Sequence, residues 1–299
     1  MIIVIHYYNP LTSSNDLIIS VDDVVIDYVI SKAEDRQKLL NKISAIPILH
    51  AAEVVHWDSY KPGTFRDQFS IRLEAGVSFW IGVALNGSSV SWGRCRLEVN
   101  PNKVGAEPVF LEMLEFLNQV TRPVTRHIKR FDLAIDIPVP REDCFLVKDR
   151  RMYIERRHGA EYTQYLGAKS SSVGRVKLYN KQAESELNYP LTRLELTLDP
   201  DTPYEKINMP VVYCLDHKEL RLDGIKLSDT DRFILGALLN GYGALTGLGR
   251  KTRKKMTELM EHHTTKIGVS EEDYTAILQQ LDMYVGKHSE SVFGSASKK

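Results

Sequence analysis

The chain has 299 residues, of which 43% are hydrophobic and 26% are charged, and its formal net charge is zero. These proportions are ordinary for a globular protein, and no apolar run is long enough to cross a bilayer, so we expect no membrane partner. The N-terminus has no basic segment or cleavage site of a signal peptide, and Cys95, Cys144 and Cys214 follow no metal pattern. We therefore expect a cytoplasmic protein with free thiols.

Positive charge is concentrated in two windows of this neutral chain. Residues 122–181 contain 14 Lys and Arg against 7 Asp and Glu, a net charge of +7, and residues 250–266 contain 6 against 2, a net charge of +4. Such unevenness predicts a basic surface that attracts nucleic acid, although solvated faces without a partner are an equally simple explanation for either window.

The predicted elements of the first two-thirds are mainly strands, bounded by Gly, Pro or Asn. Two segments, 33–45 and 108–120, instead repeat apolar residues at helical spacing, and Pro108 suits a first helical turn. The predicted strands are 2–7, 24–30, 52–57, 68–73, 77–84, 90–99, 127–137, 151–156, 161–167, 174–180 and 191–198.

The last third of the chain is predicted to be helical. Ser228 and Asp231 have the spacing of a helix N-terminal capping box, and 250–264 and 270–285 also fit helices. The sum is an α+β fold, with a mostly antiparallel twisted sheet, flanking helices and a helical C-terminal region. We expect a catalytic domain over 1–220, a DNA-recognition region over 221–286 and a disordered tail over 287–299.

Carboxylates recur on predicted strands. In KRFDLAID, Arg130, Asp132 and Asp136 share one strand face, and TRLELTL places Glu195 in a similar setting. Carboxylates on adjoining strands suit Mg²⁺ or Mn²⁺, which prefer oxygen ligands, although a solvated outer face gives the same alternation. The earlier RCRLEV offers Glu98, in a similar or a structural role.

A single tyrosine stands in a basic stripe. In VGRVKLYNKQAE, strand alternation places Arg175, Lys177, Tyr179 and Lys181 on one face. A phenol is a poor nucleophile at neutral pH, but we expect a nearby cation to lower its pKa and to attract a phosphodiester. Attack on DNA is one hypothesis for Tyr179, and ordinary packing in a strand is the other.

Four motifs in this order, RLEVNPNK (96–103), RFDLAIDI (130–137), YLGAKSSSVGRVKLYNKQAE (165–184) and RLELTL (193–198), resemble one family. It comprises the rolling-circle plasmid replication initiators of the pT181 type, the Rep_trans family, which are related to relaxases of conjugative elements. The resemblance spans about residues 20–265. It implies metal-dependent nicking and closing of one strand at the double-strand origin, through a covalent 5′-phosphotyrosine and a free 3′ hydroxyl.

The resemblance also implies roles for individual residues. The nucleophile falls on Tyr179, assisted by Lys177 and Lys181, and the Mg²⁺ or Mn²⁺ site falls on Asp132, Asp136 and Glu195. Tyr165 is the nearest rival nucleophile and is expected to pack or to position DNA. Arg130 and Arg175 are expected to contact DNA. The chain has no His-x-His metal motif, so carboxylates must carry the metal binding.

The family further implies a homodimer, a host helicase as partner, and an origin bound both as duplex and as an extruded single strand. Origin recognition falls on the basic helix near the C-terminus, although a plain charged helix face has the same composition. Its cations are Arg250, Lys251, Arg253, Lys254 and Lys255.

Two other functions remain open from the sequence: a relaxase acting at a transfer origin, and a non-catalytic protein that binds an origin or operator. The stretch GALTGLGRKT lacks the spacing of a phosphate-binding loop, so we assign no ATP site.

Overall fold

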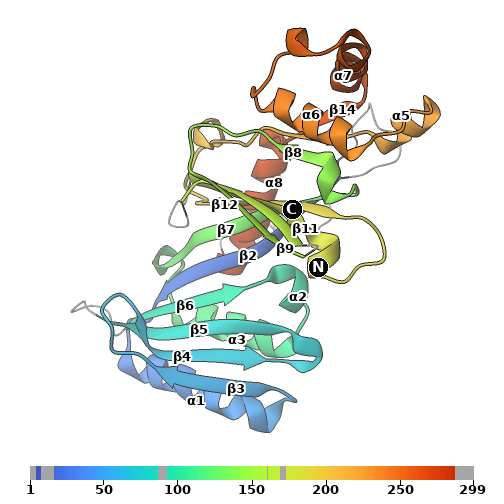
Figure 1. The fold of residues 1–299 in the computed structure, drawn as a ribbon. Coiled ribbons are helices and arrows are strands. Elements are labelled where there is room, and N and C mark those ends of the chain that lie inside the picture. The colour runs from blue at the N-terminus through green and yellow to red at the C-terminus, as the bar shows by residue number, and fades with distance from the viewer. Residues whose placement is uncertain (1–4, 8–16, 87–92, 160, 169–172, 287–299) are drawn as a thin grey trace, which may run out of the picture.

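The computed structural model describes residues 5–7, 17–86, 93–159, 161–168 and 173–286, and the expected tail over 287–299 lies outside them. The α+β prediction is confirmed: a large antiparallel sheet is flanked by helices, and further helices follow in the C-terminal part (Figure 1).

The large sheet is antiparallel at every strand pair of the described residues. Two long strands, β2 and β7, lie at its centre and carry many β-branched and aromatic residues, which favour extended backbone. In spatial order the strands are β3 (Glu53–Asp58), β4 (Phe65–Arg72), β5 (Ser78–Leu85), β6 (Arg94–Val99), β2 (Leu17–Val29), β7 (Arg126–Ile137), β12 (Thr192–Leu198), β11 (Val173–Asn180), β10 (Glu161–Leu166) and β9 (Tyr153–His158), with β1 (Ile5–Tyr7) paired to β2.

Several of the described helices begin at a residue whose side chain caps them, whereas α1, α3 and α7 begin without such a cap. Ser228 and Asp231 form the predicted capping box, and Ser270 and Asp273 form a second one. Within the described residues, every helix is too short or too polar to span a membrane. The helices are α1 (Ala33–Leu49), α2 (Pro101–Val104), α3 (Pro108–Val120), α4 (Lys181–Glu184), α5 (His217–Leu222), α6 (Asp229–Leu239), α7 (Arg250–His262) and α8 (Glu271–Leu281).

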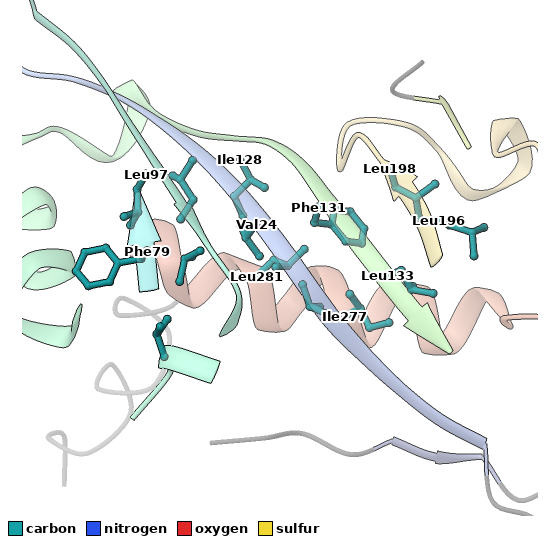
Figure 2. Close-up of a cluster of buried hydrophobic side chains, with 14 of the residues drawn as sticks. Val24, Phe79, Leu97, Ile128, Phe131, Leu133, Leu196, Leu198, Ile277 and Leu281 are labelled. Atoms are coloured by element: carbon teal, nitrogen blue, oxygen red, sulfur yellow. The ribbon is translucent and has the colours of Figure 1, made fainter. Parts of the chain in front are cut away.

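One face of the large sheet is apolar and is covered by helices. Phe131 and Leu133 of β7 and Leu196 of β12 pack in one cluster with Ile277 and Leu281 of α8 (Figure 2). Apolar residues of α1 and α3 join the same cluster. Burying one such side chain stabilises the fold by about 1.5–3 kcal/mol. Because strand side chains alternate, this packing turns the charged residues of β7, β11 and β12 toward the opposite face.

The C-terminal part has a small core of its own. A second sheet of order β14-β13-β8 combines Cys144–Leu146 (β8), Val212–Leu215 (β13) and Thr264–Ile267 (β14). Phe145 and Leu215 pack there with residues of α6 and α7. Helix α8 returns to the main core, so the C-terminal region shares residues with both cores. The boundary at 220–221 remains a prediction. The three cysteines are free thiols, as predicted, and the structure shows that all three are buried.

Candidate active site

Tyr179 and Glu195 form the centre of the charged face. Strands β11 and β12 pair so that Lys177 lies opposite Glu195, and Tyr179 lies opposite Arg193. The Tyr179 hydroxyl donates a hydrogen bond of 2.6 Å to Glu195 Oε1, and Lys177 Nζ donates one of 3.3 Å to Glu195 Oε2. The same Nζ lies 3.8 Å from the centroid of the Tyr179 ring. One carboxylate therefore holds the phenol and the nearest lysine together.

Tyr179 is more enclosed than a tyrosine on an open sheet face would be. Its side chain is buried, with only 4% of the residue exposed, and Glu195 is also buried. Burial, followed by the charge and the hydrogen bond of Glu195, raises the pKa of Tyr179. The expectation that neighbouring lysines lower this pKa is wrong for the protein without bound ions. The phenol stays protonated, and its proton is directed at a carboxylate that can accept it.

Lys181 does not continue the stripe along the strand. Strand β11 ends at Asn180, whose side chain caps α4, and Lys181 is the first residue of that helix. Its ammonium pairs with Glu184 and lies 5.9 Å from the centroid of the Tyr179 ring. Lys181 therefore remains beside the phenol, although it comes from a different element.

The Asp136 carboxylate, which was predicted to bind a metal ion, instead accepts hydrogen bonds from Arg193. Arg193 donates to Asp136 Oδ1 at 2.6 Å and to Oδ2 at 2.8 Å, and its third nitrogen donates to Asp22 Oδ1 at 2.8 Å. Asp132 and Asp136 are four strand residues apart, which separates their Cα atoms by about 13 Å. One ion cannot bind both, and Asp136 is held by a bidentate ion pair.

Two further carboxylates, Asp22 and Asp23, come from a β-bulge that the sequence analysis missed. The pairing of β2 with β7 shifts register between Val21 and Asp23, and Asp23 then lies opposite Asp132. A bulge inserts an extra residue, so two consecutive side chains reach the same region. The available signal was a pair of aspartates within a β-branched run, which breaks strict alternation.

Asp23, Glu98 and Asp132 form an acidic group on the three adjacent strands β2, β6 and β7. Burial, then the charges of Glu98 and Asp132, raise the pKa of Asp23 to about 7. Arg130, predicted to contact DNA, instead donates to Asp23 and to Glu98, both at 3.2 Å. The buried Oδ1 atom of Asp132 has no hydrogen-bond partner in the described part of the chain.

These observations fit a hard divalent cation at the acidic group. An unpartnered buried carboxylate oxygen and mutual repulsion between acids are both relieved by a bound Mg²⁺ or Mn²⁺ ion. Asp22 connects this group to the tyrosine, because its charge acts on both Asp23 and Glu195. Asp132 thus keeps surroundings suited to its predicted role, whereas Glu195 is bonded to Tyr179 and Lys177.

A tighter group of potential ligands lies elsewhere. Among the described residues, only His56, Asp58 and Asp67 bring three potential ligand atoms within 4.8 Å of one another. They belong to β3 and β4, on the opposite side of the central strands from β11. Arg36 also donates to Asp67, at 3.2 Å, so this group carries a competing cation of its own.

Aromatic and basic side chains extend the charged face toward the edge strand β9. Tyr165 lies opposite Lys177 in the pairing of β10 with β11. The guanidinium carbons of Arg175 and Arg156 lie 5.4 and 5.8 Å from the centroid of the Tyr165 ring. Proteins commonly bind single-stranded nucleic acid through cations that lie beside aromatic rings. Arg175 and Tyr165 are therefore placed as a DNA contact would require.

The predicted basic helix exists as α7, at the far end of the C-terminal part (Figure 1). Arg250, Lys251 and Lys254 are exposed. Arg253 is also exposed but donates to two backbone carbonyls, and Lys255 pairs with Asp231 at 2.8 Å. Among the residues that the structure describes, Arg250, Lys251 and Lys254 therefore face solvent without such bonds, whereas Arg253 and Lys255 also stabilise local structure.

The sequence matches no model of a known protein family and no curated protein sequence. This chain is similar to a solved structure, that of a rolling circle replication initiator protein from Geobacillus stearothermophilus. The match covers 89% of this chain and 96% of the Geobacillus chain. The sequence identity is 12% and the TM-score is 0.38.

Proposed function

We propose that this chain is a rolling-circle plasmid replication initiator of the pT181 type, in the Rep_trans family, which nicks and closes DNA at the double-strand origin. One observation carries the proposal: the Tyr179 hydroxyl donates a 2.6 Å hydrogen bond to Glu195, with Lys177 beside both. A tyrosine with a proton acceptor and a cation within reach has the parts that nucleophilic attack on a phosphodiester requires. The order of the four sequence motifs supports the same assignment.

In the proposed reaction, residues of this chain accept the tyrosine proton and offset the negative charge of the phosphate. Glu195 takes the proton of the Tyr179 hydroxyl as the phenolic oxygen attacks the phosphorus, and the bond from phosphorus to O3′ breaks. The leaving oxygen takes up a proton from solvent water and becomes a free 3′ hydroxyl, while the 5′ phosphate remains on Tyr179. Lys177 offsets negative charge at the phosphate. The phosphotyrosine bond replaces the phosphodiester bond, so attack by a 3′ hydroxyl closes the strand again.

Asp23, Asp132 and Glu98 would hold the Mg²⁺ or Mn²⁺ cofactor. The charge of Asp22 acts both on Asp23 of this group and on Glu195 beside the tyrosine. When bound, such an ion supplies a Lewis acid for a phosphate oxygen. Without it, burial keeps the pKa of Tyr179 well above neutral pH, so the phenol retains its proton, and it raises the pKa of Asp23 to about 7, so that carboxyl is only partly ionised. The free protein is therefore expected to be inert.

The substrate follows from the enclosure of the site. Tyr179 is 4% exposed, so duplex DNA cannot reach it directly, and we assign an extruded single strand as substrate. Lys177 and Lys181 have flexible stems and can move from the phenol ring to the incoming phosphate. Tyr165 and Arg175 supply a contact for the strand beside the phosphate, and α7 is assigned to the duplex. A homodimer, a host helicase and a cytoplasmic location complete the proposal.

The test is formation of a covalent complex. The full chain is incubated with Mn²⁺ and labelled single-stranded oligonucleotides that span the replicon carrying its coding sequence, and complexes that survive denaturation are counted. We expect an adduct with the wild type and none with Tyr179→Phe, which keeps the ring and loses the attacking oxygen. Tyr165→Phe is the matched control from the neighbouring strand and is expected to retain the adduct.

Binding is measured in parallel by a gel-shift assay. Tyr179→Phe should bind the reactive oligonucleotide as well as the wild type does. If no oligonucleotide of the set gives an adduct with the wild type while duplex fragments bind, the protein is a DNA-binding protein without nicking activity.

A further inference from the structure

A cavity of about 850 Å³ lies on the opposite face of the large sheet from Tyr179, at its β9–β10 edge. Tyr162 and Gln164 of β10 line it, whereas Thr163 and Tyr165 of the same strand share the face of Tyr179. Residues of β8 and α6 form its other walls, so the cavity lies between the edge of the main sheet and the C-terminal part. The proposed nicking chemistry does not use it.

Cations stacked on tyrosine rings line this cavity, together with the carboxylates of Glu142, Glu155 and Asp229, of which Glu155 pairs with Arg157. The guanidinium carbons of Arg141 and Arg157 lie 4.4 and 4.1 Å from the centroid of the Tyr162 ring. Lys148 Nζ lies 4.1 Å from the Tyr153 ring centroid and 5.0 Å from that of Tyr242. The Lys148 ammonium has no carboxylate partner among the described residues. Its charge is therefore available to an anion that enters the cavity.

Arg141 is a buried cation in the cavity wall. Only 3% of the residue is exposed, and it pairs with no carboxylate in the part of the chain that the structure describes. It donates to the Cys144 carbonyl at 2.7 Å and to the side chain of Gln164, and its buried Nε atom has no hydrogen-bond partner among the described residues. A buried guanidinium without a counter-ion is costly unless an acceptor can approach it.

Two aromatic side chains at the cavity are open to solvent. Phe233 of α6 is 77% exposed, and Tyr242, which follows the same helix, is 66% exposed. Exposed rings next to cations can stack on the flat face of a nucleobase, while the cations meet its phosphate. A purely apolar ligand would leave the charges of Arg141 and Lys148 without a partner, and a simple anion would leave the rings unused.

We propose that this cavity binds a nucleotide, with its base against Tyr242 and Phe233 and its phosphate near Lys148 and Arg141. The nucleotide is either free or an unpaired residue of a DNA strand, because both present the same base and phosphate. The site is separate from Tyr179, and its occupancy does not require strand cleavage.

The test measures binding of thymidine 5′-monophosphate and of 5′-phosphorylated dithymidylate to the full chain, by isothermal titration calorimetry in EDTA. The variant is Lys148→Gln with Tyr242→Ala, which alters two exposed side chains. Its control is Lys61→Gln with Tyr60→Ala, an exposed pair of the same types outside the cavity. We expect affinity to fall roughly tenfold or more in the variant and to stay within about twofold in the control.

The two ligands distinguish the source of the nucleotide. Binding of the monophosphate identifies a site for a free nucleotide, and binding of the dinucleotide alone identifies a site for a strand. Equal affinity in variant and control, displacement by inorganic phosphate as readily as by the monophosphate, or no binding of either ligand would overturn the proposal. Tyr179→Phe should leave this binding unchanged. The calorimetry therefore tests the cavity, and the covalent-complex assay tests nicking at Tyr179, independently of each other.

Discussion

Arg193 donates to both carboxylate oxygens of Asp136, at 2.6 and 2.8 Å, and this pair joins strands β12 and β7 on the charged face. The third donor of the same guanidinium reaches Asp22 on β2. The fork of an arginine matches a carboxylate in this bidentate way, and both partners are largely buried. Asp136 therefore fixes the backbone beneath the proposed site, and Asp22 is held between Arg193 and the acidic group.

Asp136→Asn should destabilise the fold. The substitution replaces one of the two acceptor oxygens by an amide donor that faces a buried N–H of Arg193, and we expect the free energy of unfolding to fall by about 1.5–3 kcal/mol. Urea unfolding monitored by circular dichroism measures it. Glu53→Gln breaks an exposed ion pair with Arg72 and should change stability by less than about 0.5 kcal/mol. Equal, small effects of both substitutions would show that the Arg193–Asp136 pair has no structural role.

Asp132→Asn should weaken binding of Mn²⁺ without destabilising the protein. The substitution removes a charge from a group whose acids repel one another, as the raised pKa of Asp23 indicates. Free Mn²⁺ measured by electron paramagnetic resonance should show affinity lowered at least about tenfold. Asp58→Asn, in the group with His56 and Asp67, is the control. If Asp58→Asn abolishes binding and Asp132→Asn does not, the ion belongs to that other group.

Regular elements were predictable because their residues repeat at a fixed period. The helix expected over 108–120 is α3 with the same bounds, and most expected strands appear within a few residues of their predicted ends. The strand expected over 24–30 begins at Leu17 instead, because the bulge at Asp22 interrupts the alternation on which the prediction rested. Strands β8, β13 and β14 are only three or four residues long, too short to show a period.

The site was predictable in its residue types and less so in its pairings. Tyr179, Lys177 and Glu195 meet because β11 and β12 pair in one particular register, which no local pattern specifies. A second register, that of β12 against β7, places Asp136 opposite Arg193. Lys181 does not lie on the strand face with Lys177 and Tyr179, because Asn180 caps a helix that begins at Lys181. The asparagine before KQAE was the sequence signal for this helix start.

Removing the exposed cations of α7 should reduce the salt dependence of duplex binding. Each phosphate contact that is lost lowers the slope of log affinity against log salt concentration by about 0.9. The triple substitution Arg250→Gln, Lys251→Gln and Lys254→Gln, titrated with an origin duplex from 50 to 200 mM salt, tests this. Lys38→Gln, an exposed lysine on α1, is the single-charge control. An unchanged slope in the triple variant would assign α7 to another purpose.

Acid should weaken the junction between α6 and α7. Burial alone would raise the pKa of Asp231, but hydrogen bonds from Lys255 and Ser228 lower it to about 2. A carboxyl with a lowered folded-state pKa stabilises the fold above its unfolded value near 3.8, and that contribution is lost as the pH falls toward 2. We expect Asp231→Asn to lose about 1 kcal/mol at pH 7, allowing for solvent screening, and only a small part of that at pH 2.

Urea unfolding at several pH values measures this contribution, and Lys255→Gln should reproduce part of the loss. A deficit of Asp231→Asn that is the same at pH 2 and pH 7 would mean that the ion pair contributes nothing.

The central claim is that DNA becomes bonded to one phenolic oxygen beside Glu195. Digestion of the covalent complex with protease and nuclease, followed by mass spectrometry, identifies the modified residue directly. We predict a nucleotide phosphate on Tyr179, and a strongly reduced yield of the same peptide from Glu195→Gln. A phosphate found on Tyr165, or on any other residue, would contradict the account.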